Sequence, residues 1–183
     1  MINAAWTLRR TMLAERPATD VEFDQVADLI RRRLTQAVAL SRRTDDTRTL
    51  VTALRRLGHV EHDAGRHDDA VGRYEEAVAV ARKATDPMLL GHAVRHLADG
   101  CRSTGRLAEA EACYDEALAL YAAAEEPPAL DYANALRPLA LLRETQGRTE
   151  EARHLWRRAR ALYARIPIRA GVTECDEHLT RVG

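Results

Sequence analysis

The sequence is poor in the residues that build β-sheets. It contains one phenylalanine and two tryptophans, and aromatic residues make up only 4% of the chain. Its apolar residues are mostly alanine and leucine, which together with arginine and glutamate are strong helix formers, whereas aromatic and β-branched residues favour strands. The composition therefore predicts an all-α protein.

Cysteines are few, and long apolar runs are missing. The three cysteines, Cys101, Cys113 and Cys175, are odd in number and form no C-x-x-C pair, which argues against a disulfide framework and fits a reducing compartment. The N-terminal segment lacks the apolar run of a signal peptide, and no stretch approaches the ~20 apolar residues that span a bilayer. We therefore expect a cytoplasmic protein with no membrane partner.

The chain has no excess of charge of either sign. Its 28 basic residues balance its 28 acidic ones, so a general nucleic-acid or membrane-surface binder, which needs a basic excess, is not expected. A local basic face is still compatible with this total.

Enzyme signatures are also missing. The sequence has no glycine-rich phosphate loop, no G-x-S-x-G motif and no Cys/His pair at a recognisable spacing. We therefore predict a protein that is not an enzyme and needs no cofactor.

What the sequence does contain is an internal repeat. Gly65, Gly105 and Gly147 are spaced by 40 and 42 residues, and each is followed by arginine. Around each glycine the same residue types recur at the same offsets: Leu57, Leu97 and Leu139; Gly58, Ala98 and Ala140; Ala70, Ala110 and Ala152; Tyr74, Tyr114 and Trp156; Ala77, Ala117 and Ala159. The small residues indicate close helix–helix approach, and the glycine predicts a left-handed residue where a first helix ends. Acidic residues follow each glycine, where they complement the dipole of a second helix.

This pattern resembles the tetratricopeptide repeat (TPR). The copy that carries the resemblance best has Leu97-Ala98 in its first helix, Gly105 at the turn, and Ala110, Tyr114 and Ala117 in its second helix. The period is longer than the family's usual ~34 residues and is similar to that of kinesin light chains and many bacterial proteins. The sequence departs from the family where Glu61, Cys101 and Arg143 replace a bulky apolar residue. The resemblance implies a right-handed α–α superhelix of about nine helices in antiparallel pairs, in one domain.

The repeat also sets the expected boundaries. We expect a degenerate pair over 1–45, built from a helix over 3–15 that stops at Pro17 and a helix from about Asp20 to Arg43. Three clear repeats follow over 46–85, 86–125 and 126–167, and a capping helix from Arg169 to Val182 closes residues 168–183. Asp86-Pro87 predicts a capped helix start.

In this family the first helices line a concave groove in which ligands bind. Carried over by column, the resemblance implies a groove whose main feature is one arginine in each clear repeat: Arg55, Arg95 and Arg137. The other groove residues that it implies are Arg56, His59, His62, His92, His96, Asp99, Arg102 and Asn134. Because arginine binds carboxylates bidentately, we expect a protein-interaction scaffold that holds an acidic peptide or a C-terminal carboxylate. Pro138, inside the third first helix, argues against a simple arginine ladder.

Three alternatives stay open. The arginines can pair with acidic residues on neighbouring helices, such as Asp99 or Asp131, and bind no ligand. The solenoid can self-associate into homo-oligomers through its ends. A third alternative is a small-ligand or metal sensor built on the histidines, since His92 and His96 share a helix face and His59, His62 and His67 cluster. A zinc site needs three or four converging ligands, so we predict no metal.

Overall fold

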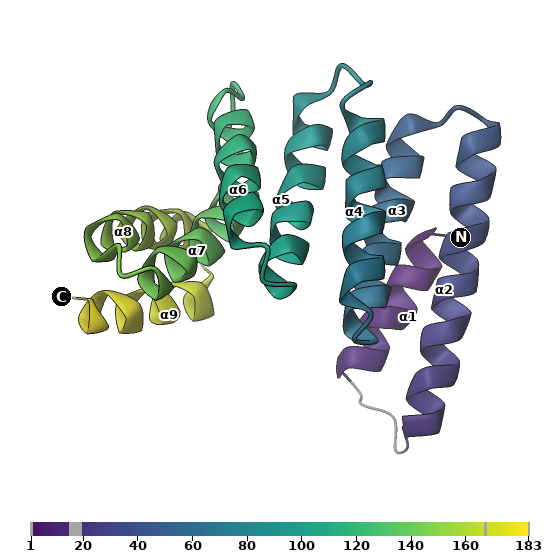
Figure 1. Cartoon of the computed structure of the whole chain (residues 1–183), viewed down its shortest axis with the longest axis horizontal. Coiled ribbons are helices and arrows are strands. Elements are labelled where there is room, and N and C mark those ends of the chain that lie inside the picture. Colours follow the sequence, from purple (N-terminus) through teal and green to yellow (C-terminus); the bar gives the residue numbers. More distant parts are fainter. Residues whose placement is uncertain (1, 15–19, 167, 183) are drawn as a thin grey trace. The chain divides into compact units, whose positions relative to one another are not determined.

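The computed structural model describes residues 2–14, 20–166 and 168–182. These ranges contain helices and no strand, so the all-α prediction and the expected number of helices are confirmed (Figure 1). The helices are α1 (Ile2–Ala14), α2 (Asp20–Arg43), α3 (Thr47–Asp63), α4 (His67–Ala81), α5 (Pro87–Ser103), α6 (Leu107–Ala122), α7 (Ala129–Thr145), α8 (Thr149–Arg165) and α9 (Arg169–Arg181). None of these helices is long and apolar enough to cross a membrane.

The chain forms two compact units, which we describe separately. Unit 1 covers Met1–Leu89 and unit 2 covers Leu90–Gly183. In unit 1, α2 packs against α1 and α3, and α3 packs against α4. In unit 2, α7 packs against α6 and α8, and α9 packs against α8.

The three repeated glycines end α3, α5 and α7 as the sequence predicts. Gly65, Gly105 and Gly147 have φ values of 73°, 77° and 72°, a region that a side chain makes costly. After α3, the Gly65 amide donates to the His62 carbonyl (3.0 Å) and the Arg66 amide donates to the Glu61 carbonyl (2.9 Å). The same pair of bonds follows α5 and α7, and this Schellman pattern satisfies the last carbonyls of each helix.

The other repeated columns form the core. The alanine and aromatic columns of the second helices are all buried, and Trp156, Tyr114 and Tyr121 are the largest side chains that are fully enclosed. Gly58 shows why a small residue is needed in the first helix. A Cβ at Gly58 would lie 2.5 Å from Cε1 of Tyr74, so the ring of the second helix occupies the space of the missing side chain.

Helix starts and the proline also follow local chemistry. The Asp86 carboxylate accepts from the amides of Met88 (3.0 Å) and Leu89 (3.1 Å), which confirms the predicted cap before Pro87. Acidic residues occupy the first turns of α4, α6 and α8, as expected. Helix α7 continues through Pro138, which is buried.

The terminal helices match their predicted ranges closely. Helix α1 begins one residue before the expected range, and α2 has the expected bounds. The predicted end of the first helix at Glu15 and its stop at Pro17 lie outside the described residues. Helix α9 ends at Arg181, one residue before the predicted Val182.

The column that departs from the family buries charge. Arg143 is only 5% exposed, and its guanidinium contacts the carboxylates of Glu111 and Glu151. Glu61 is also buried; it accepts from Arg66 Nε (2.5 Å), and burial raises its pKa. Buried ions need such partners, because an unpaired charge away from water is costly.

Candidate functional site

In unit 2 three of the predicted groove residues act on one tyrosine. Tyr163 of α8 is buried, and its hydroxyl donates to Asn134 Oδ1 of α7 at 2.8 Å. Burial raises the pKa of Tyr163 to about 12, and the positive charges of Arg137 and Arg95 act in the opposite direction. Arginines from α5 and α7 therefore both act electrostatically on the same hydroxyl. Asn134 contacts Tyr163 directly, whereas Arg95 and Arg137 act on it through their charges.

Arg137 already contacts a carboxylate. Its Nε donates to Glu174 Oε2 on α9 at 2.7 Å, and this hydrogen bond raises the pKa of the guanidinium. The Arg137 side chain is still 42% exposed. The alternative of internal pairing is thus seen at Arg137, although the partner is neither Asp99 nor Asp131.

Arg95 is more enclosed, and it pairs within its own helix. Its Nη1 donates to Asp99 Oδ2 at 2.9 Å, its Nη2 lies 2.7 Å from His96 Nε2, and only 12% of its side chain is exposed. Asp99 Oδ1 also accepts from the Tyr114 hydroxyl at 2.6 Å. Asp99 therefore links the arginine to the core as well as pairing with it, although the internal alternative placed the acid on a neighbouring helix.

The remaining predicted residues of unit 2 differ in exposure. His92 Nδ1 lies 3.2 Å from the Tyr121 hydroxyl and 3.4 Å from Asp131 Oδ1 on α7. His96 is buried, at 8% exposure, and Arg102 is exposed. His92 and Arg102 can therefore reach solvent, whereas His96 is enclosed and contacts Arg95.

In unit 1 the predicted residues contact the first helix. Arg56 Nη1 donates to Asn3 Oδ1 at 3.1 Å, and its guanidinium lies over the Trp6 ring, 5.0 Å from the centroid. His59 lies between the rings of Trp6 and Tyr74. Arg55 is partly exposed, and its place on one surface with the arginines of unit 2 stays a prediction.

The histidines do not gather as metal ligands do. His62 is exposed, and its ring packs edge-on against His67, with centroids 4.8 Å apart. Over residues 2–14, 20–166 and 168–182, no group of three His, Cys, Asp or Glu side chains is placed to hold a metal ion. The three cysteines are free thiols.

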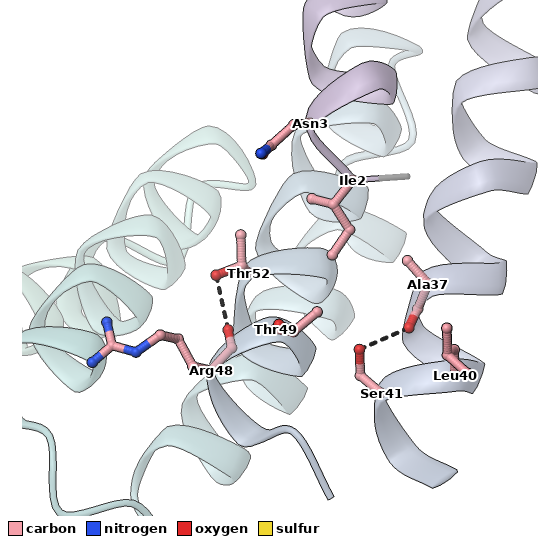
Figure 2. Close-up of a pocket in the computed structure, with 8 residues that line it drawn as sticks. All are labelled: Ile2, Asn3, Ala37, Leu40, Ser41, Arg48, Thr49 and Thr52. Atoms are coloured by element: carbon pink, nitrogen blue, oxygen red, sulfur yellow. Dashed lines mark hydrogen bonds between the residues drawn. The ribbon is translucent and has the colours of Figure 1, made fainter. Parts of the chain in front are cut away.

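A cavity in unit 1 was not predicted from the sequence. It has a volume of about 470 Å³ and lies between the N-terminal end of α1, the C-terminal end of α2 and the start of α3 (Figure 2). The Thr52 and Ser41 hydroxyls at its edge donate to the carbonyls of Arg48 and Ala37, so they offer few donors to a ligand. Leu40 is 51% exposed beside it. No repeated column marks this place, because the α1–α2 pair is the degenerate one.

Comparison with known protein families identifies the family of the chain. Sequence models of the tetratricopeptide repeat match residues 50–87 and 90–165, which together make up more than half of the chain. The chain belongs to the tetratricopeptide repeat family. No curated protein matches the sequence significantly.

Solved structures share the fold at low sequence identity. A Podosopora anserina protein of the kinesin light chain type, with nearly identical TPR-like repeats, gives a TM-score of 0.70 at 19% identity over 97% of this chain and 82% of that one. The Rap protein complexed with Competence and Sporulation Factor gives 0.73 at 15% identity, over 99% of this chain and 56% of that one. A signal transduction ATPase from Pyrococcus horikoshii with a TPR sensor gives 0.76 at 16% identity, over 97% and 26%.

These matches confirm the all-α TPR solenoid fold that the sequence predicts. TPR repeats are typically non-enzymatic scaffolds, and the fold suggests a role in protein–protein interaction.

Proposed function

We propose that the chain is a non-enzymatic scaffold that binds an acidic peptide, or an acidic segment of a partner protein, through Arg95, Asn134 and Arg137 of unit 2. One observation carries the proposal. Arg137 is 42% exposed and holds a carboxylate, that of Glu174, at 2.7 Å. A ligand carboxylate would use the same donors.

The internal pair does not exclude a ligand on energetic grounds. Partly exposed ion pairs contribute only about 0–1 kcal/mol, because water and salt screen the charges and both side chains lose freedom. A peptide with several carboxylates offers Arg137 an equivalent partner and adds further contacts. Exchange of Glu174 for a ligand carboxylate is therefore inexpensive.

Asn134 adds a second kind of recognition. Its Oδ1 accepts from the Tyr163 hydroxyl, so its amide NH₂ is left to donate to a ligand. An amide next to an arginine suits a peptide carbonyl beside an acidic side chain. Buried Tyr163 fixes the amide, and this reduces the ordering cost of binding.

Other residues extend the surface in the proposal. His92 and Arg102 are partly or fully exposed on α5, and Asp99 orients Arg95. In unit 1, the predicted residues Arg55, Arg56, His59 and His62 are proposed as ligand contacts in their own right. The fold is shared with the Rap protein that was crystallised with Competence and Sporulation Factor, which is consistent with a peptide ligand.

Selection of random short peptides against the full chain tests this function. We expect enriched peptides rich in Asp and Glu, or ending in an acidic residue. Arg137→Gln should weaken their binding roughly tenfold in a fluorescence anisotropy titration, since a charge-assisted hydrogen bond is lost.

Arg157→Gln is the matched control, because Arg157 is an exposed arginine of α8 outside this surface. Its binding should stay close to that of the unchanged chain. Acidic peptides that bind the Arg137 and Arg157 variants equally well would remove the basis of the proposal.

A further inference from the structure

A second cavity lies in unit 2, away from the arginine surface. It is an open hollow with a volume of about 560 Å³, within the range of ligand pockets, and it is lined by residues of α6, α7 and α8. Its apolar lining comes from Leu118 and Ala119 of α6, Leu139 of α7 and Leu155 of α8. None of Arg95, Asn134 or Arg137 lines it. It is therefore a site distinct from the proposed peptide surface.

The space exists because α6 has small residues on this face. Ala119 and Ala122 line the cavity, and both are exposed. The matching positions of the preceding repeat hold Ala79 and Arg82, so the pair of small residues is not shared by every repeat. From Asp115 to Ala122 the cavity runs about 10 Å along α6, which is about two helical turns.

The two ends of the cavity differ in charge. Asp115, Glu150 and Glu151 lie at the end where α8 begins, together with Arg143, and Arg158 lies beside Tyr132 at the other end, with His154 between them on α8. Glu150 pairs with Arg153 (2.5 Å) and Glu151 pairs with Arg148 (2.7 Å). The Arg158 guanidinium lies over the Tyr132 ring, 5.3 Å from the centroid, and donates to its hydroxyl. The Arg158 guanidinium is thus held by the Tyr132 ring and hydroxyl.

Asp115 is the most weakly neutralised of the carboxylates at the acidic end. Arg143 contacts Glu111 closely and lies 3.4 Å from Glu151, but its distance to Asp115 is 4.0 Å. The Asp115 side chain is 58% exposed. Burial and the neighbouring charge of Glu111 raise the pKa of Asp115, although Arg143 opposes this. An added cation at this point would stabilise the ionised carboxylate.

We infer that this cavity binds a partner helix that inserts one large apolar side chain between α6 and α8 and places a lysine or arginine on Asp115. Asp115 and Ala119 are one turn apart on α6, so the apolar and basic residues of the partner are three or four positions apart. Apolar burial supplies most of the affinity. The carboxylates select a basic residue at the fixed spacing and so determine the direction in which the partner helix lies.

Random short peptides selected against the full chain again serve as the probe. Here the selected peptides are divided into those that a second variant still binds and those that it no longer binds. Ala119→Trp fills the cavity from an exposed position and leaves the core residues in place. The peptides that this variant no longer binds should contain Lys or Arg three or four positions from Leu, Ile, Met or Phe. Their affinity should fall at least roughly tenfold in Ala119→Trp, because the indole occupies their binding space.

Asp115→Asn tests the charge without changing the shape, and it should weaken the same peptides roughly threefold at low salt. Ala79→Trp is the matched control, because Ala79 is exposed at the equivalent position of unit 1. It should leave binding unchanged.

Three outcomes overturn the inference. In the first, no selected peptide is sensitive to Ala119→Trp. In the second, the sensitive peptides lack a basic residue or bind Asp115→Asn equally well. In the third, sedimentation shows a dimer that Ala119→Trp dissociates, which makes a second copy the occupant. Failure of the arginine surface would appear only in the Arg137→Gln arm, so the two proposals are tested separately.

Discussion

The Arg137 guanidinium of α7 holds the Glu174 carboxylate of α9 at 2.7 Å. The C-terminal helix thus places an acid on the arginine that we propose as the main ligand contact. Any acidic ligand must compete with this internal carboxylate. The contact also helps to hold α9 against α7, so ligand binding and the docking of α9 are expected to be linked.

The close approach of Gly58 to Tyr74 predicts a stability change. Gly58→Ala should lower the free energy of unfolding by about 1–3 kcal/mol, because the new Cβ would lie 2.5 Å from a ring that is buried. Urea unfolding of the full chain measures the change.

Gly72→Ala is its matched control, since Gly72 is an exposed helical glycine with no neighbouring atom within 4 Å of the added Cβ. It should stabilise the chain by about 0.5–1 kcal/mol through helix propensity. If Gly58→Ala stabilised the chain as much as Gly72→Ala does, the packing described for α3 and α4 would be wrong.

The buried Arg143 predicts an acid-sensitive contribution to stability. The hydrogen bond from Arg143 lowers the pKa of Glu111 to about 2 from 4.5. The folded state therefore binds fewer protons, so this stability is present above pH 4.5 and is lost as the pH falls towards about 2. In Glu111→Gln the free energy of unfolding should be lower at neutral pH and should change less over this window.

Urea unfolding at a series of acidic pH values tests this prediction. Glu177→Gln, which changes an exposed carboxyl of α9, is the control and should keep the slope of the unchanged chain. An identical slope in Glu111→Gln would show that the Arg143 pair does not contribute as described.

The raised pKa of Tyr163 predicts that the free energy of unfolding falls as the pH becomes alkaline. Burial raises its pKa to about 12 from 10.0, so between these values the unfolded chain loses a proton that the folded chain keeps. The free energy of unfolding should therefore fall as the pH rises through this window. Ultraviolet titration of phenolate absorbance should show that Tyr163→Phe removes a late-ionising group. Loss of an early-ionising phenolate instead would contradict the enclosed position beside Asn134.

The turns and the core were predictable because each depends on local chemistry. Glycine adopts a φ near 75° without the cost that a side chain brings. Gly65, Gly105 and Gly147 therefore mark the helix ends in the sequence itself. The alanine and aromatic columns repeat because every helix pair solves the same packing problem. The cap at Asp86 likewise needs only its own neighbours along the chain.

The partners of the charged residues were not predictable in the same way. The arginine column was visible, but the acid on Arg137 comes from α9, a helix that the sequence suggests only as a cap. Arg143 replaces a bulky apolar residue of the family, and the repeat pattern does not reveal that it is buried among acids from α6 and α8. The cavity beside Ala119 arises from small residues whose significance depends on the facing helix. Such relationships join residues far apart in sequence, and repeat spacing does not determine them.

The affinity of the Glu174→Gln variant for an acidic peptide, selected on the unchanged chain, tests the central claim most directly. Removal of the competing carboxylate should increase affinity roughly two- to fivefold, in keeping with the modest strength of a partly exposed ion pair. The gain should be absent when Arg137→Gln is also present, and Glu177→Gln should show no gain. An affinity that is unchanged or reduced in Glu174→Gln would contradict the account, because Arg137 would then not be the residue that receives the ligand carboxylate.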